Sequence, residues 1–273
     1  MGGISTTILC ILKFYDMRTS IKKLIILFIL LLLAAISPNL FMAAQAGVAS
    51  FSQLVLWFLF PSVALLVLVI IIAKYLKYRD VTQLALNGLL AGSLATIALE
   101  IFRETGFRLG AMPGDLPRLM GVLMLNQFAT GPDIWSDLAG WAYHFWNGAI
   151  FGLIFSLLLG KPKIWQGILY GLFIGIVFMI SPVVKSLGIG LFGVDFKDGY
   201  QFALTVTIAH AAFGLCLSLL LMKWNKGFRV IWRRFKTKNI KKQSEVTTQY
   251  KSPLPTSGRS LKGKASIKKL VGF

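Results

Sequence analysis

Cysteine and acidic residues are both scarce in this sequence, and their scarcity argues against several classes of protein. The chain has 2 cysteines, and its 10 aspartates and glutamates stand against 29 lysines and arginines. Cys10 lies near the N-terminus and Cys216 lies inside an apolar run, which argues against a disulfide framework or a thiolate metal site. Only 14% of the residues are charged, whereas soluble domains carry about 25%.

Catalytic sequence motifs are also missing. The sequence contains no glycine-rich nucleotide-binding loop, no zinc-protease motif and no nucleophile elbow. We therefore predict that the protein is not an enzyme, and the motifs predict no metal ion and no cofactor.

Long apolar runs are abundant instead. Apolar residues make up 56% of the 273 positions, and the mean hydropathy is +0.72. Five runs have about the 20 residues that a helix needs to cross hydrocarbon, and a shorter run at 24–36 weakens at Pro38. The runs are continuous rather than alternating, which argues against a β-barrel. The prediction is an all-α, polytopic membrane helical bundle with six spans, five of which are 54–73, 81–101, 138–159, 164–184 and 202–222.

The charges that flank these runs sort by side. Lysines and arginines precede the first run and follow the second, fourth and sixth runs, whereas the other loops carry slightly more acids than bases. Because basic loops stay in the cytoplasm, this pattern places both ends of the chain there.

The N-terminal segment, residues 1–46, has two interpretations. Arg18, Lys22 and Lys23 precede the apolar core, and Ala44-Gln45-Ala46 follows it, as in a cleaved secretory signal. Cleavage would leave five spans in the same topology. The other interpretation is an uncleaved anchor helix.

Two pairs of spans resemble each other. Residues 87–92 align with residues 166–171, and residues 151–159 align with residues 213–221. The third and fourth spans thus look like a first copy of a helical hairpin, and the fifth and sixth like a second. Both copies start on the same side, so we predict two parallel helical-hairpin repeats.

Small residues recur at four-residue spacing along these spans, so each set shares one helix face. Small residues on one face let helix backbones approach closely in lipid. We therefore predict that eight glycines pack the bundle: Gly88, Gly92, Gly148, Gly152, Gly167, Gly171, Gly175 and Gly214.

Polar residues on the same faces are the candidate functional residues. Glu100, His144 and His210 continue the small-residue stripes, and Asn147 lies close to His144 in the sequence. An ionisable side chain inside the membrane usually has a partner or a function. A rise of 1.5 Å per residue places Glu100, His144 and His210 roughly 5, 9 and 14 Å below the outer edge. This ladder suits proton movement, while haem ligation by both histidines and ordinary hydrogen-bonded histidines are the alternatives.

The longest outer loop, 103–133, contains a predicted helix. Met112-Pro113-Gly114 predicts a turn, Asp115 is a candidate helix cap, and Pro117 fits the first turn of a helix. We therefore predict an interfacial helix over the mouth of the bundle, which is either a passive cover or a lid. Its apolar face is predicted to consist of Leu116, Met120, Leu123 and Met124.

The tail, 223–273, is strongly basic. Aromatic residues alternate there with cations, and from Gln243 onward the composition predicts disorder. We expect the first part to bind anionic lipid headgroups rather than nucleic acid. The headgroup-binding residues would be Arg229, Arg233, Arg234 and Lys236.

The segment from Lys161 to Gly171, which contains Trp165-Gln166-Gly167, and the segment His144-Phe145-Trp146-Asn147 resemble the YagU-type family of bacterial inner-membrane proteins. The resemblance covers about Val81 to Met222. It implies a multi-helix fold and an inner-membrane location, but it carries no established reaction.

The leading interpretation is a non-enzymatic, multi-pass protein of the bacterial inner membrane that passes protons or a small solute through the bundle. A membrane assembly or scaffold factor and a haem-binding redox protein using His144 and His210 are the alternatives. The lipid bilayer is the expected partner in each case, and protein partners are not predicted.

Overall fold

The computed structural model describes residues 3–197 and 199–227, and the side chains of residues 21–197 and 199–227. The described chain is helical and contains no strand. Six helical segments are long and apolar enough to cross a membrane, which confirms the predicted number. They are Ile21–Gln45, Phe51–Tyr75, Arg79–Arg108, Ile134–Leu159, Ile164–Ser186 and Tyr200–Trp224.

These segments are built from helices that extend past the apolar runs. The elements, in chain order, are α1 (Gly3–Gln45), α2 (Phe51–Leu54), η1 (Val55–Leu59), α3 (Phe60–Tyr75), α4 (Arg79–Arg108), α5 (Leu116–Met124), α6 (Ile134–Leu159), α7 (Ile164–Met179), α8 (Pro182–Ser186), η2 (Leu191–Gly193) and α9 (Tyr200–Trp224).

Local polar contacts explain two of the extensions. The last turns of α4 carry an ion pair of 2.9 Å between Glu104 and Arg108, four residues apart on one face. The start of α6 has a capping box, in which the Asp133 carboxylate accepts a hydrogen bond of 2.8 Å from the Ser136 amide. Polar residues therefore continue both helices beyond the apolar segments that predicted them.

Helix α1 continues through Pro38, where the apolar run weakens. Proline removes one backbone donor from a helix and displaces the preceding turn. Two side chains bind carbonyl groups of this turn: the Tyr143 hydroxyl donates to Ser37 O at 2.6 Å, and Asn39 Nδ2 donates to Ala35 O at 2.7 Å. These bonds add contacts to the turn that precedes the proline.

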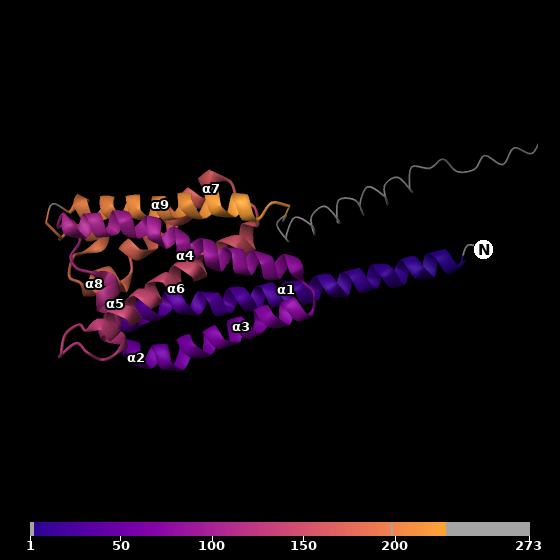
Figure 1. Ribbon diagram of the computed structural model, residues 1–273, viewed down its shortest axis with the longest axis horizontal. Coiled ribbons are helices and arrows are strands. Elements are labelled where there is room, and N and C mark those ends of the chain that lie inside the picture. Colours follow the sequence, from indigo (N-terminus) through magenta and orange to yellow (C-terminus); the bar gives the residue numbers. More distant parts are fainter. Residues whose placement is uncertain (1–2, 198, 228–273) are drawn as a thin grey trace, which may run out of the picture. The chain divides into compact units, whose positions relative to one another are not determined.

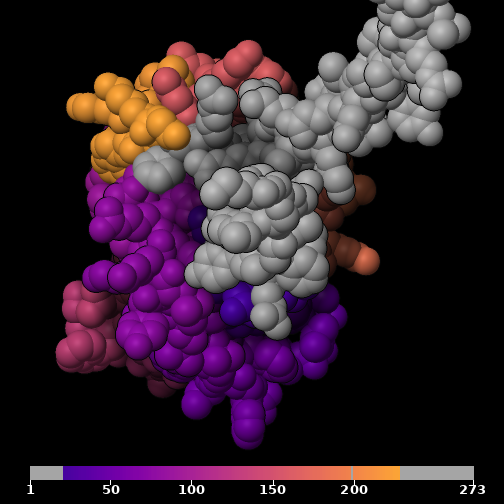
Figure 2. All heavy atoms as spheres, turned by 90° about the vertical axis from the view of Figure 1, so that its right-hand side faces the viewer, coloured from indigo at the N-terminus to yellow at the C-terminus, as the bar shows by residue number. Residues whose placement is uncertain are grey.

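The long helices lie side by side (Figure 1). Helix α4 packs along α6 and α9, α7 packs along α9, and α1 packs along α3 and α6. We call the end where α3 leads into α4 and α6 leads into α7 the basic end, and the end that carries α5 and α8 the far end. Figure 2 views the basic end, with α9 and α3 on opposite sides of it. An ion pair of 3.0 Å between Lys23 and Asp80 joins α1 to α4 there.

Glycines permit direct backbone contact between paired helices. A Cβ atom added to Gly92 would overlap the carbonyl oxygen of Gly148, and one added to Gly152 would overlap that of Gly88, so α4 and α6 touch through their backbones. No side chain fits between two helices at this distance.

The second helix pair uses glycines in the same way. A Cβ atom on Gly167 would overlap the carbonyl oxygen of Gly214, and one on Gly171 would overlap that of His210. Gly175 differs, because a Cβ atom added to it would lie 3.1 Å from the His210 ring rather than against backbone. The internal repeat itself stays a prediction.

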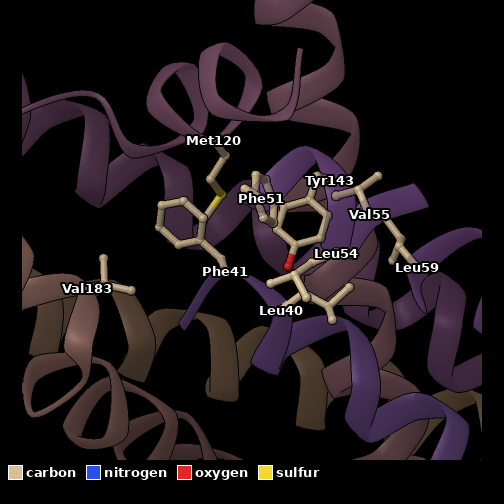
Figure 3. Close-up of a cluster of buried hydrophobic side chains, with 9 residues drawn as sticks. All are labelled: Leu40, Phe41, Phe51, Leu54, Val55, Leu59, Met120, Tyr143 and Val183. Carbon is tan, nitrogen blue, oxygen red and sulfur yellow. The ribbon is translucent and has the colours of Figure 1, made fainter. Parts of the chain in front are cut away.

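Helix α5 is docked on the bundle through a second set of close contacts. A Cβ atom on Gly121 would overlap the carbonyl oxygen of Ser136, and one on Gly140 would overlap that of Pro117. Met120 is buried in an apolar cluster that joins α1, α2, η1, α5, α6 and α8 (Figure 3). The aromatic rings of Phe41, Phe51 and Tyr143 meet edge to face within this cluster at centroid distances of 5.2 Å.

Candidate functional site

A buried cluster of charged residues lies at the far end of α4. The Arg103 guanidinium donates from Nε to both Glu100 carboxylate oxygens at 2.8 Å, and its Nη2 lies 2.7 Å from Oε2. From α6, His144 Nε2 lies 2.8 Å from Oε1 of the same carboxylate. Glu100 is 8% exposed and Arg103 is 5% exposed, so both charges lie inside the protein.

Further acids surround Arg103. Its Nη1 lies 3.3 Å from Asp115 Oδ1, at the start of α5, and its Nη2 lies 3.5 Å from Glu104 Oε2. Burial raises the pKa of Asp115, and the Arg103 charge opposes this shift. Asp115 occupies the predicted N-cap position of α5, with Pro117 in the first turn, but its side chain makes no capping hydrogen bond. The carboxylate faces the guanidinium instead.

Charge within this cluster is close to balanced. Three carboxylates, from Glu100, Glu104 and Asp115, meet the guanidinium groups of Arg103 and Arg108. With a neutral His144 the cluster has one net negative charge, and protonation of His144 makes it neutral. The Trp141 ring adds a cation–π contact, with Arg103 Cζ 5.7 Å from its centroid.

A cavity of about 290 Å³ adjoins the cluster. Helices α1, α4, α5, α6, α7, α8 and α9 all contribute to its wall. Most of the lining is apolar, and the polar groups on it include Arg103, His144, Asn147 and His210. An apolar pocket with a few converging polar groups is the usual form of a small-molecule site.

His210 lines the same cavity but binds its own helix. Its Nδ1 lies 2.8 Å from Val206 O, and because a carbonyl only accepts, Nδ1 must carry the proton. In the neutral ring Nε2 is then an acceptor. The ring also lies nearly parallel to Phe178, at a centroid distance of 6.3 Å. His210 is therefore held in one orientation by α9 and α7.

Asn147 connects the cavity wall to α1. Ser37 Oγ donates to Asn147 Oδ1 at 2.6 Å, next to the bond from Tyr143 to Ser37 O. Phe41 and Met42, one turn further along α1, also line the cavity. The N-terminal helix is thus one wall of the candidate site.

The basic-end half of the bundle is closed by polar and backbone contacts. Ser156 Oγ donates to Leu84 O at 2.7 Å. Asn225 is fully buried and donates to Gly160 O at 2.8 Å and to Ser156 Oγ at 3.1 Å, while its own oxygen accepts from Asn87 at 2.9 Å. These bonds tie α4, α6 and the end of α9 together below the cavity.

The four polar candidates fall around one cavity, although Glu100 lies behind its wall. Helical rise places Glu100 and His144 at different depths, yet they touch, because the contact depends on how α4 and α6 are aligned. Sequence reasoning missed Arg103 and Asp115 as their partners. The spacing of three residues between Glu100 and Arg103 was the available signal, since such residues are neighbours on a helix.

The predictions about metal ions, haem and the basic tail concern different parts of the chain. Among the side chains that the structure describes, no group of three His, Cys, Asp or Glu residues could hold a metal ion. Haem binding stays a prediction, and it would compete with Glu100 for His144 Nε2. The proposed headgroup-binding residues lie outside the described residues: Arg229, Arg233, Arg234 and Lys236.

Comparison with protein-family models, with curated proteins and with solved structures finds no match to this chain. The resemblance to the YagU-type family therefore stays a prediction.

Proposed function

We propose that this chain is a non-enzymatic, multi-pass protein of the bacterial inner membrane that binds a small solute in the cavity and couples its passage to a proton on His144. Its basic end would face the cytoplasm, because lysines and arginines flank the helices there. The six apolar helices and the resemblance to the YagU-type family support this location. The basic tail would bind anionic lipids on the same side.

The contact between Glu100 and His144 at the cavity wall is the observation that carries the proposal. An imidazole can accept and release a proton, so His144 is the candidate carrier at the cavity wall. Arg103 orients the Glu100 carboxylate by an ion pair, and this carboxylate would stabilise the protonated ring. A solute in the cavity would meet the ring on its other side and respond to its charge.

Passage to the cytoplasm requires the basic end to open. The bonds of Asn225 to α4 and α6 close that end, so the described arrangement is open only above it. If the two hairpins are repeats, relative movement of α7 and α9 against α4 and α6 would break these bonds. Transporters commonly work by such movements of one repeat against another.

We also propose that α1 remains in the mature protein. Its residues Ser37, Phe41 and Met42 contact or line the site, and Lys23 pairs with Asp80. Cleavage after residue 46 would remove one wall of the cavity.

Proton flux in proteoliposomes tests the proposed function. With a pH-sensitive dye inside the vesicles and an imposed pH gradient, wild-type protein should acidify the lumen faster than empty vesicles. Glu100→Gln and His144→Phe should each lower the rate by about tenfold or more, equivalent to ~1.4 kcal/mol in the barrier. Asp137→Asn is the matched control, because this acid lies on α6 with His144 but pairs with Arg118 at 3.0 Å and does not line the cavity.

The same experiment separates the other interpretations. A scaffold protein should give no flux in the wild type and should tolerate both substitutions. A haem protein should show a Soret absorption band after purification, and loss of that band in His210→Phe would favour it. Wild-type flux that survives both Glu100→Gln and His144→Phe would refute the proposed proton site.

A further inference from the structure

The cavity opens toward the side of the bundle. Two of its lining residues are exposed: Asn39, on α1, and Phe173, on α7, which is 62% exposed. Both residues lie inside helices that are long and apolar enough to span a membrane. Helix α1 packs on α3 and α6, whereas α7 packs on α9, so the two sides of the mouth belong to different parts of the bundle.

The surface around this mouth is apolar. Leu32 on α1 and Leu169 and Ile176 on α7 are 53%, 56% and 47% exposed. In a bilayer these side chains would face acyl chains, because exposed apolar residues of a span contact lipid. A ligand that reaches the cavity through this mouth must therefore come from the bilayer.

The cavity has an apolar body and a polar end. Phe151, Phe173 and Phe213 line the body, while Arg103 and His144 lie at the end next to the charged cluster. Its volume of about 290 Å³ is at the lower limit for ligand pockets. That volume holds a small polar head and the first part of an apolar chain, with the remainder left in the bilayer.

The polar end favours an uncharged head. The positive charge of Arg103 is already paired with Glu100, and the cluster as a whole has one net negative charge when His144 is neutral. An anionic head would meet this excess of carboxylates at short range and low dielectric, which costs energy. Arg103 can still donate hydrogen bonds, and neutral His210 presents Nε2 as an acceptor. Hydroxyl groups on the head can accept from the first and donate to the second.

We infer that the ligand of this cavity is an uncharged membrane amphiphile with a small hydroxyl-bearing head and a long apolar chain, which enters between α1 and α7. This inference rests on the proposed function and specifies its solute. It replaces a water-soluble solute from the outer side by a lipid-soluble molecule. A hydroxyl head is neither a proton donor nor a proton acceptor near neutral pH, so it acts by hydrogen bonding beside His144, and the proton stays on the His144–Glu100 pair.

Photo-crosslinking in proteoliposomes tests the inference. The probe is a monoacylglycerol with a diazirine in the acyl chain near the head, and labelled peptides are mapped by mass spectrometry. We expect labelling at 39–42 in α1 and 173–178 in α7. An excess of unlabelled monoacylglycerol should reduce it by about tenfold, the competition expected for a ligand in tenfold excess over its dissociation constant. Labelling of the exposed face of α3 reports general lipid contact and should not respond to the competitor.

Two variants test the route and the volume. Asn39→Trp blocks the mouth and Val177→Phe fills the cavity, and each should abolish the competed labelling. Ile25→Trp is the matched control, because Ile25 is exposed on the same helix but lines neither the cavity nor its mouth. Each variant must elute as wild type in gel filtration. Should Val177→Phe fail to fold, Asn39→Trp alone decides, since its side chain bonds only to its own helix.

Three results would overturn the inference. Competition by glycerol as strong as by the monoacylglycerol would mean a water-soluble solute. Stronger competition by a fatty-acid anion would mean a charged head. Labelling that no competitor reduces, or that persists in both variants, would mean that the cavity takes no lipid. Because the labelling needs no pH gradient, proton flux without competed labelling refutes only this inference, and competed labelling without flux refutes only the proposed function.

Discussion

Removal of Arg103 should destabilise the protein more than removal of its main partner, Glu100. Both side chains are buried, and breaking a buried ion pair by removing one member costs about 3–5 kcal/mol. In Arg103→Gln three carboxylates remain without their central cation. In Glu100→Gln the guanidinium keeps Asp115 at 3.3 Å and Glu104 at 3.5 Å. We therefore expect about 3–5 kcal/mol for Arg103→Gln and about 1–3 kcal/mol for Glu100→Gln.

The double variant isolates the cause. If the loss comes from an unpaired buried charge, Glu100→Gln combined with Arg103→Gln should cost clearly less than the sum of the two single changes, with a coupling of about 2 kcal/mol. Arg108→Gln is the control, because this side chain is 78% exposed, and exposed ion pairs contribute at most about 1 kcal/mol.

Unfolding in mixed micelles with increasing dodecyl sulfate, followed by tryptophan fluorescence, measures these free energies. pH adds a second readout. The pKa of Asp115 is raised by burial in the folded protein, so its contribution to stability is present at low pH and is lost as pH rises through the folded value. Loss of Arg103 removes the opposing charge, so the defect of Arg103→Gln should shrink as pH falls. Equal stability of Arg103→Gln and Arg108→Gln, or additivity in the double variant, would refute this account.

Two further predictions concern local packing. Gly92→Ala places a Cβ on the Gly148 carbonyl oxygen and should lower the free energy of unfolding by about 1–3 kcal/mol or prevent folding. Gly114→Ala is the control, because the space around Gly114 is open and the change should be neutral in the same unfolding assay. Equal effects of the two substitutions would contradict backbone contact between α4 and α6. The pKa of Asp133 is lowered, chiefly by its hydrogen bond from the Ser136 amide, so the cap of α6 is present above the ordinary carboxyl pKa and is lost as pH falls through the lowered value. Protection factors for hydrogen exchange at 134–138, corrected for the pH dependence of intrinsic exchange, should fall in that range and should be low at all pH values in Asp133→Ala. Protection factors that do not change with pH would contradict it.

The helices could be predicted from the sequence because the information is local. A continuous apolar run of sufficient length specifies a spanning helix regardless of its neighbours, and all six segments correspond to predicted runs. The ends of the helices were predicted less accurately than their positions. Arg108 and Asp133 make polar contacts that extend α4 and α6, and hydropathy does not measure such contacts. Similarly, Pro38 marks a break in the pattern but not in α1, where partners from α6 and Asn39 support the turn.

The same reasoning predicts some residues of the site but not the contacts between them. Four-residue spacing assigns Glu100, His144 and His210 to inward faces, because one helix determines each face. It cannot show that Glu100 and His144 touch, because that depends on how two helices are aligned. Asp115 is harder still to predict from the sequence, because its contact with Arg103 depends on the docking of α5 on α6. The cavity also depends on α1, which the sequence left open to removal as a signal.

The cavity follows from a gradient in side-chain size along the contact faces. On α4 the face changes from Gly88 and Gly92 near the basic end to Thr96 and Glu100 near the far end, and on α6 it changes from Gly152 and Gly148 to His144. Helices that touch through glycine must separate where the same faces carry long side chains, because the interaxial distance follows the residues at the contact. On α9 the step from Gly214 to His210 has the same direction. The polar residues therefore do two things at once: they separate the helices, and they line or border the space that the separation creates. Replacing His210 by glycine would remove one of these spacers, so the helices should approach and the cavity should become smaller. In a uniformly packed core, by contrast, removing a side chain leaves a larger cavity.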